Sequence, residues 1–246
     1  MRTALLSDIH GNLHALEACL DDARRRGIDR IIFLGDYVGY GADAEAVVQR
    51  IAVEVAGGAI AIRGNHDEAI EGDDRYMNET ARHAIAHARA TLSESGRRFL
   101  RELPYVHGER HATYAHASAA QPERYPYIDS PAAAAQCATA AGTPLSFCGH
   151  VHDQRLYFAA RAERMTLFRP HPARPVPTPL HRRWVAIIGS VGQPRDRNPL
   201  AGYALWDDVR CNLLFLRVAY DHRAAAQRIR EVGLPPSLAV RVEQGF

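Results

Sequence analysis

Residues 3–12 read Thr-Ala-Leu-Leu-Ser-Asp-Ile-His-Gly-Asn, an apolar run followed at once by polar groups and a glycine. The apolar run predicts a buried β-strand, and Gly11 with Asn12 predicts a turn into a helix. Asp8 and His10 are two residues apart, and side chains at that spacing lie on the same face of a strand. The stretch therefore predicts a carboxylate and an imidazole that can hold one cation at the C-terminal end of the strand.

Similar apolar runs recur along the chain and predict further buried strands. They lie at residues 31–34, 59–62, 112–115, 145–148 and 185–188. Between these strands, for the first three of them, leucine, valine and alanine residues recur at helical spacing, which predicts a helix after the first strand and another after the second. A strand–helix–strand–helix–strand order favours right-handed crossovers and a mainly parallel sheet with helices on one face.

The middle of the chain predicts a small helical insertion over residues 70–104, with helices at 79–90 and 93–103. Such an insertion can lean over a site as a cap. Residues 161–183 are rich in Arg and Pro, and these prolines exclude a long regular element, so we expect an exposed loop there.

Near the C-terminus, residues 202–219 predict an antiparallel hairpin that turns at Asp207-Asp208. Residues 221–232 predict a closing helix. The sequence contains no internal repeat and no linker long enough to divide it. We therefore expect a single domain over residues 1–246.

Composition excludes several classes of protein. The formal net charge is +2 and the longest basic run is Arg24-Arg25-Arg26, so no basic block favours nucleic-acid binding. Four cysteines are far apart and form no C-x-x-C pair, which argues against a zinc knuckle or a disulfide framework. No apolar run approaches membrane-spanning length, and no cleavable signal precedes the first strand. We expect a cytoplasmic protein without a membrane partner; the sequence indicates no oligomeric state.

Polar side chains follow five of the predicted strands directly, at the point where each strand ends. They are Asp8 with His10, Asp36, the run Arg63-Gly64-Asn65-His66-Asp67, His116, and His150 with His152. In open α/β sheets the carboxyl ends of the strands form the ligand crevice. We therefore expect these side chains to converge.

With these residues the chain resembles the calcineurin-like metallophosphoesterases. The matching blocks are D-x-H at residues 8–10, G-D at 35–36, G-N-H-D at 64–67, a histidine at 116 and G-H-x-H at 149–152. A further block at 189–196, with the hairpin that follows it, is similar to a small bacterial branch of predicted phosphodiesterases. The resemblance covers nearly the whole chain. It implies a four-layer α/β/β/α sandwich, of which the residues alone support the parallel half and the late hairpin.

The resemblance also implies a centre with two divalent metal ions. One ion would be held by Asp8, His10 and His152, the other by Asn65, His116 and His150, and Asp36 would bridge the two. Imidazole nitrogen and carboxylate oxygen suit borderline divalent ions. Manganese is favoured, with iron, zinc, nickel or magnesium as alternatives. Two such ions can orient a phosphate and lower the pKa of a bridging water, whose hydroxide attacks phosphorus in line.

Four further residues are candidates for the chemistry around the metal ions. The resemblance places His66 over the leaving group as a general acid, and Asp67 is a candidate to orient it. Arg63 and Arg195 are candidates for phosphate contacts, because a guanidinium matches the geometry of a phosphate. A surface or loop-anchoring role is the alternative for both arginines.

Other histidines compete with this assignment. His107 precedes a glycine and could replace His116 as a ligand, but residues 105–107 predict the outer arm of a hairpin whose inner arm ends at His116. Ala117 stands where the family often has glycine. If that position required a positive φ, the alanine would be strained. His83 and His87 are four residues apart on a predicted helix, a spacing that can bind zinc, although packing is the simpler interpretation.

These residues together imply a phosphoesterase that depends on two metal ions and hydrolyses a phosphodiester or phosphomonoester of a small substrate. A serine/threonine protein phosphatase is the alternative enzyme, and it needs an open groove that a helical cap would obstruct. A non-catalytic metal-binding scaffold is the alternative outside the enzymes. A scaffold should lack bridging or general-acid residues, whereas Asp36 and His66 are both present. The sequence does not identify the substrate.

Overall fold

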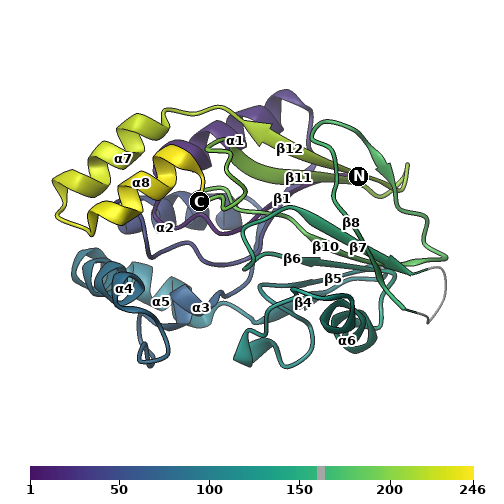
Figure 1. Cartoon of the computed structure of the whole chain (residues 1–246). Coiled ribbons are helices and arrows are strands. Elements are labelled where there is room, and N and C mark those ends of the chain that lie inside the picture. Colours follow the sequence, from purple (N-terminus) through teal and green to yellow (C-terminus); the bar gives the residue numbers. More distant parts are fainter. Residues whose placement is uncertain (160–163) are drawn as a thin grey trace.

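The structure, a computed structural model, describes residues 1–159 and 164–246 (Figure 1). Two sheets of six strands each lie face to face between layers of helices (Figure 1). The four-layer α/β/β/α arrangement implied by the family resemblance is therefore confirmed. Each sheet is mixed, with parallel and antiparallel pairs side by side.

The first sheet contains the N-terminal strands and the late hairpin. Its order is β3 (Ile60–Ala61), β2 (Arg30–Phe33), β1 (Arg2–Leu6), β11 (Ala201–Asp207), β12 (Asn212–Val218) and β9 (Val176–Pro177). The first three strands are parallel, and the crossovers between them are α1 (Leu13–Arg25) and α2 (Ala44–Ala56). Both β11 and β12 pair antiparallel, as the hairpin pattern predicts.

The second sheet contains the strands that deliver the later histidines. Its order is β4 (Val106–Gly108), β5 (Ala112–Ala115), β6 (Leu145–Cys148), β10 (Arg183–Ile187), β7 (Arg155–Ala159) and β8 (Thr166–Phe168). The parallel pairs are β5 with β6 and β6 with β10. The expected hairpin before His116 is present as β4 and β5. Helix α6 (Pro131–Ala141) covers the outer face of this sheet, and the sequence pattern predicted neither α6 nor β7.

Alternation along β1 shows how the layers are formed. Ala4 and Leu6 belong to the core between the first sheet and its helices, whereas Leu5 belongs to the core between the two sheets. Trp184, Phe147 and Phe215 fill that second core. Successive side chains of a strand point to opposite faces, so one short strand contributes to both cores.

The remaining helices cover the first sheet. Helices α4 (Glu79–Thr91) and α5 (Glu94–Glu102) match the predicted insertion, and their buried side chains join the same core as α1 and α2. A short helix α3 (Asn65–Glu68) precedes them, and a 3₁₀ turn, η1 (Pro122–Arg124), follows β5. The predicted closing helix is α7 (His222–Glu231), and a second helix, α8 (Pro236–Gln244), packs beside it. Pro236 at the first position of α8 suits a helix start, because that position needs no N–H donor.

The Arg- and Pro-rich stretch is not wholly a loop. Residues 161–163 of that prediction lie outside the described residues, but residues 164–183 contain β8 and β9. Both strands are short, and β9 with its Pro177 is at the edge of the first sheet. Proline is tolerated at an edge because its missing N–H is not needed there.

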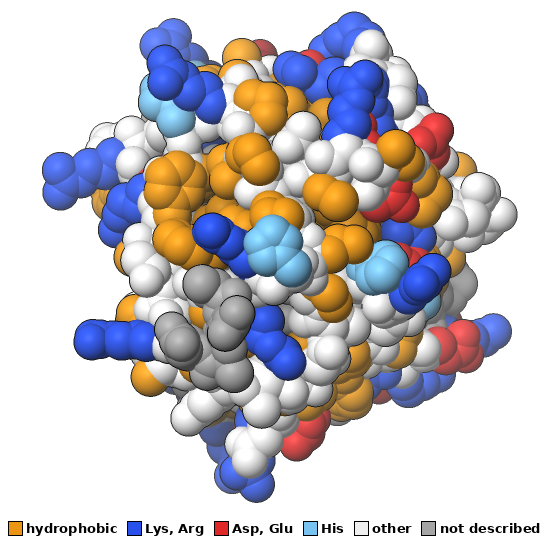
Figure 2. Space-filling view, turned by 90° about the vertical axis from the view of Figure 1, so that its right-hand side faces the viewer, with side chains coloured by type: hydrophobic (Ala, Val, Ile, Leu, Met, Phe, Trp, Pro, Cys, Tyr) orange, Lys and Arg blue, Asp and Glu red, His pale blue; other side chains and the backbone are white. Residues whose placement is uncertain are grey.

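The surface away from the carboxyl ends of the parallel strands is seen in Figure 2. Hydrophobic side chains gather near the middle of this face, with Arg side chains around them and the acidic groups toward the periphery (Figure 2). Within residues 1–159 and 164–246, no helix combines the length and the hydropathy needed to span a bilayer.

Candidate metal centre

Seven side chains that the sequence predicts as metal ligands meet in the loops between the two sheets. They are Asp8 and His10 after β1, Asp36 after β2, Asn65 at the start of α3, His116 after β5, and His150 with His152 after β6. All seven are buried, and the most exposed, His150, keeps 7% of its surface. Loops from both sheets therefore deliver polar groups to one buried place.

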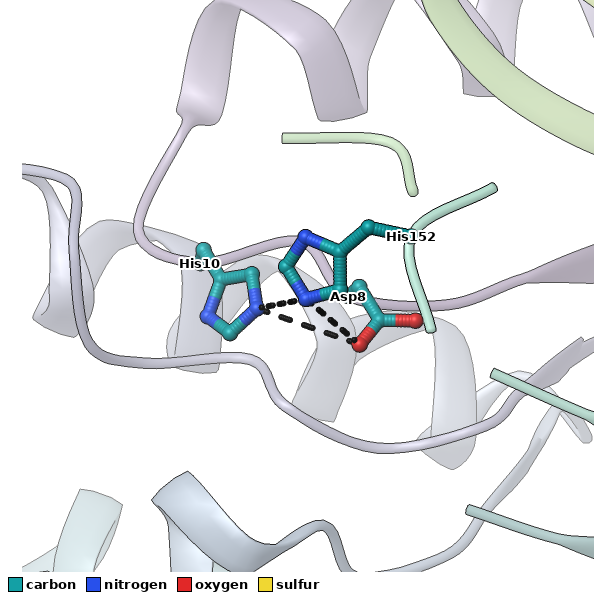
Figure 3. A group of neighbouring side chains, drawn as sticks. All are labelled: Asp8, His10 and His152. Carbon is teal, nitrogen blue, oxygen red and sulfur yellow. Dashed lines mark hydrogen bonds and ion pairs between the residues drawn. The ribbon is translucent and has the colours of Figure 1, made fainter. Parts of the chain in front are cut away.

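Asp8, His10 and His152 form the first cluster (Figure 3). The Nε2 atoms of His10 and His152 are 3.0 Å apart. Asp8 Oδ1 lies 3.2 Å from Nε2 of His152 and 3.8 Å from Nε2 of His10. The three donor atoms face one another, as ligands of a single ion would (Figure 3).

Asp36, His116 and His150 form the second cluster. Nε2 of His116 lies 3.3 Å from Asp36 Oδ2 and 3.2 Å from Nδ1 of His150. The same Asp36 oxygen is 3.7 Å from Nε2 of His10, so Asp36 of the second cluster also lies next to the first cluster. Oδ1 of Asn65 is buried and makes no hydrogen bond to the part of the chain that the structure describes.

Hydrogen bonds to backbone carbonyls fix the imidazole tautomers. Nδ1 of His10 faces Val38 O at 3.0 Å, Nδ1 of His152 faces Gln193 O at 2.6 Å, and Nδ1 of His116 faces Leu34 O at 2.7 Å. A carbonyl only accepts, so each Nδ1 carries the hydrogen and each Nε2 of a neutral ring presents a lone pair. Facing lone pairs need a cation between them, and a metal-bound imidazole usually donates its other N–H to a group such as a backbone carbonyl. The donor set fits a metal centre.

Burial and mutual charge determine the protonation of these groups. Burial opposes ionisation of Asp36, but the imidazoles of His116 and His66 outweigh it and hold the pKa of Asp36 well below its usual range. Burial also opposes protonation of His116, yet the Asp36 carboxylate raises the pKa of His116 to about 9. Burial and the neighbouring His116 lower the pKa of His150 to about 3. The place around Asp36 thus favours positive charge, whether a proton or a metal ion supplies it.

Backbone strain is concentrated at the same residues. Asp8, His10, Asp36, His150 and His152 have φ angles of 54°, 49°, 58°, 67° and 64°. This left-handed region is uncommon for residues other than glycine and costs roughly 1–3 kcal/mol at each position. The finding corrects the strand-alternation argument for Asp8 and His10, because β1 ends at Leu6 and the two side chains converge from a loop.

Asp67 does not orient His66, contrary to the prediction. Its Oδ2 accepts hydrogen bonds from the backbone N–H groups of Asp36 at 2.8 Å and Gly64 at 2.9 Å, and its Oδ1 accepts one from Tyr37 N at 2.8 Å. Burial and the nearby Asp36 raise the pKa of Asp67 to about 7. Asp67 therefore fastens the loop after β2 to the start of α3, because its carboxylate can accept several backbone donors at once.

His66 lies beside the two clusters, and with His10 and Asp36 it forms a third group of side chains that could hold a metal ion. Its ring centre is 4.6 Å from that of Tyr40 and 4.8 Å from that of His10. Its Nδ1 is buried and has no hydrogen-bond partner within the described residues, and a Cβ on Gly39 would lie 2.2 Å from that atom. Burial lowers the pKa of His66 to about 4, so the imidazole is neutral near pH 7.

A cavity of about 690 Å³ opens onto the clusters. Arg195 lines it together with Asp36, His66 and His150, and its guanidinium carbon lies 5.6 Å from the centre of the Tyr40 ring. Nε of Arg195 is buried and makes no hydrogen bond to the described part of the chain. Arg195 is thus placed where a ligand of the cavity could reach it.

Arg63 has a different position from the one that a phosphate contact requires. Its guanidinium donates to the backbone oxygen of Arg101, and its carbon lies 4.9 Å from the centre of the Tyr105 ring. It is not one of the residues that line the cavity. The structure gives Arg63 the anchoring role, because it ties the end of β3 to α5.

The competing histidines lie away from the clusters. His107 is on β4 next to Glu109, with its side chain 35% exposed. His83 is exposed on α4, and Nε2 of His87 makes a hydrogen bond of 3.2 Å to the carbonyl oxygen of Ala42. Ala117 is not among the described residues with positive φ, so no strain arises there.

Sequence reasoning missed the tyrosines around the site. Tyr40 packs on His10 with ring centres 4.6 Å apart, and Tyr127 packs on His150 at 4.1 Å. Tyr125 donates to Glu68 Oε2 at 2.6 Å, and Tyr76 also lines the cavity. Only Tyr40 had a signal in the sequence, since it lies four residues after Asp36 in the loop that follows the second strand.

Comparison with known proteins agrees with this geometry. Residues 1–208 match the calcineurin-like phosphoesterase superfamily domain. An uncharacterized protein of Methanocaldococcus jannaschii is 31% identical over 98% of this chain and 97% of its own length. The crystal structure of a metallophosphoesterase from Sphaerobacter thermophilus is 34% identical, covers both chains fully and superposes with a TM-score of 0.90. A hypothetical protein of Pyrococcus horikoshii, 20% identical over 100% of this chain and 98% of that one, shares the fold with a TM-score of 0.78.

Proposed function

Because the chain belongs to the calcineurin-like phosphoesterase superfamily, we propose that it hydrolyses a small phosphodiester or phosphomonoester with the help of two divalent metal ions. The observation that carries this proposal is the pair of buried His/Asp clusters that meet at Asp36. In the first cluster the imidazole lone pairs of His10 and His152 face each other, and in the second Nε2 of His116 faces Nδ1 of His150. Both clusters border a cavity.

Asp8, His10 and His152 would hold one ion, and Asn65, His116 and His150 would hold the other, with Asp36 shared. Two bound ions would neutralise phosphate oxygens and lower the pKa of a coordinated water. Nitrogen and oxygen donors without a thiolate suit manganese, and iron, zinc, nickel or magnesium are alternatives.

Arg195 and His66 are the residues proposed to act on the substrate itself. The Arg195 guanidinium lines the cavity and can donate two hydrogen bonds to a phosphate. His66 would donate a proton to the departing oxygen. The negative charge of a bound ester would favour the imidazolium form that this role requires.

A small substrate is proposed because residues 73–81 and 123–127 form walls of the cavity. A cavity of about 690 Å³ lies within the range typical of small-molecule sites. A protein phosphatase would instead need room for an extended phosphopeptide.

The test is hydrolysis of bis-p-nitrophenyl phosphate and p-nitrophenyl phosphate after the protein is stripped with a chelator and reloaded with manganese. We expect about two ions per chain by elemental analysis and turnover that depends on them. Two bound ions without turnover of either ester would favour the scaffold. Turnover confined to a phosphoserine peptide would favour the protein phosphatase.

A further inference from the structure

Two tyrosines stand out at the cavity because their rings are largely exposed. Tyr76 keeps 64% of its surface and Tyr127 keeps 55%, although both line the cavity that borders the buried metal clusters. A single exposed aromatic residue on a protein surface is ordinary. Two in one concave site, from separate segments of the chain, form an aromatic surface next to the proposed reaction centre.

Each ring is positioned against a predicted metal ligand. The hydroxyl of Tyr76 donates to the backbone oxygen of Asn65 at 3.3 Å. The Tyr127 ring centre lies 4.1 Å from that of His150, with the two planes 36° apart. An aromatic surface fixed at two predicted ligands of the second ion lies within reach of a group esterified to a phosphate bound there.

The rest of the wall has the composition of a site for an organic group. Met77 and Ala81 are buried apolar residues of the same cavity. Glu123 and Arg124 lie on the wall beside Tyr127 and offer an acceptor and a donor. Pockets for flat heterocycles combine aromatic and apolar surface with a few polar groups in this way.

We propose that Tyr76 and Tyr127 stack against a planar aromatic group carried by the substrate, so that the site selects nucleoside phosphoesters. The inference rests on the proposed function and names its substrate class. Any of the nucleobases can stack on a tyrosine ring, because every base has a π-face. Stacking on an aromatic side chain is worth about tenfold or more in affinity.

The first experiment compares two ligands that differ only in the base, adenosine 5′-monophosphate and ribose 5-phosphate. Calorimetry on the manganese-loaded protein should give an affinity for adenosine 5′-monophosphate that is about tenfold higher or more. Tyr76→Leu and Tyr127→Leu should weaken binding of adenosine 5′-monophosphate only, so that the two affinities become similar. Tyr127→Phe keeps the aromatic ring and should preserve the difference between the two affinities. Phe168→Leu removes an exposed ring on β8 and should change neither ligand.

The second experiment separates this inference from the proposed function. Thymidine 5′-(p-nitrophenyl phosphate) and methyl p-nitrophenyl phosphate release the same leaving group. The tyrosine variants should lose about tenfold more kcat/KM for the thymidine ester than for the methyl ester. Equal affinities and equal kcat/KM values in the unaltered protein would overturn the inference alone. Failure to bind either phosphate and to cleave either ester would overturn the proposed function and the inference with it.

Discussion

Single residues of this centre are held in conformations that their side chains do not favour. Five of the seven predicted ligands have left-handed φ values, and the surrounding loops hold them through bonds such as His150 N to Asp8 Oδ2 at 2.9 Å. Strain of this kind persists where the structure around it over-determines the backbone. The D-x-H and G-H-x-H spacings predicted which residues would meet. They could not predict that loops, rather than strand alternation, bring them together.

His66 provides the first prediction. His66→Gln should leave metal content unchanged and lower kcat by about 10²–10⁴-fold, the usual contribution of a general acid. A general acid must be protonated, so kcat should fall as the pH rises through the His66 pKa of the substrate complex, and the variant should lose this limb. The measurement is a pH profile with esters of poor and good leaving groups. Full turnover of the poor leaving group by the variant would contradict the assignment.

Asp67 provides the second prediction. Asp67→Asn replaces a carboxylate that accepts four backbone N–H groups with an amide that has a single acceptor oxygen. We expect a loss of about 1–3 kcal/mol in the free energy of unfolding, because buried donors lose their partners. Urea denaturation measures it. The control is Asp21→Asn, whose side chain is 62% exposed. Equal stabilities of the two variants would argue against the fastening role.

Among the helices and strands, those with a regular pattern of apolar residues could be predicted from the sequence. Those that are very short, or that lack contrast between apolar and polar residues, could not. Leucine and valine spacing predicted α1 and α2, and alternation predicted the β11–β12 hairpin. Helix α6 reads Pro-Ala-Ala-Ala-Ala-Gln-Cys-Ala-Thr-Ala-Ala, and its small side chains give almost no contrast between faces. Strand β9 has only two residues, one of them a proline, so its pairing depends on β12 and not on its own sequence.

The loop after β6 provides the third prediction. A Cβ at Gly149 would lie 1.8 Å from Ser7 Oγ and 2.5 Å from Asp8 Oδ2, so Gly149→Ala must displace the Asp8 carboxylate. We expect metal affinity to fall by about 10- to 100-fold, as when a group that orients a ligand is lost. Titration with manganese after chelation measures it. Gly108→Ala on β4 is the matched control, since a Cβ there meets nothing within 4 Å. Unchanged affinity in the Gly149 variant would show that Asp8 is not a ligand or that the loop adapts.

At the scale of the whole molecule, the candidate centre lies between the two sheets. Asp8, His10 and Asp36 come from loops of the first sheet, whereas His116, His150 and His152 come from loops of the second. Bonds such as His150 N to Asp8 already join the two sets. Metal ions held there would therefore connect the two halves of the fold as well as serve the reaction.

If the proposed ions bind there, their binding should also contribute to the stability of the fold. An ion that binds only the folded protein at about 100 times its dissociation constant stabilises it by about 2.7 kcal/mol. For a chain of this length, that corresponds to a rise in Tm of roughly 5–10 °C. Chelation should remove the rise and manganese should restore it, as followed by calorimetry. Asp36→Asn should reduce the metal-dependent rise most, because Asp36 belongs to the second cluster and also lies next to the first. The exposed Asp21→Asn control should keep the full rise, and a Tm that chelator leaves unchanged in the unaltered protein would show that the two sheets associate without help from metal.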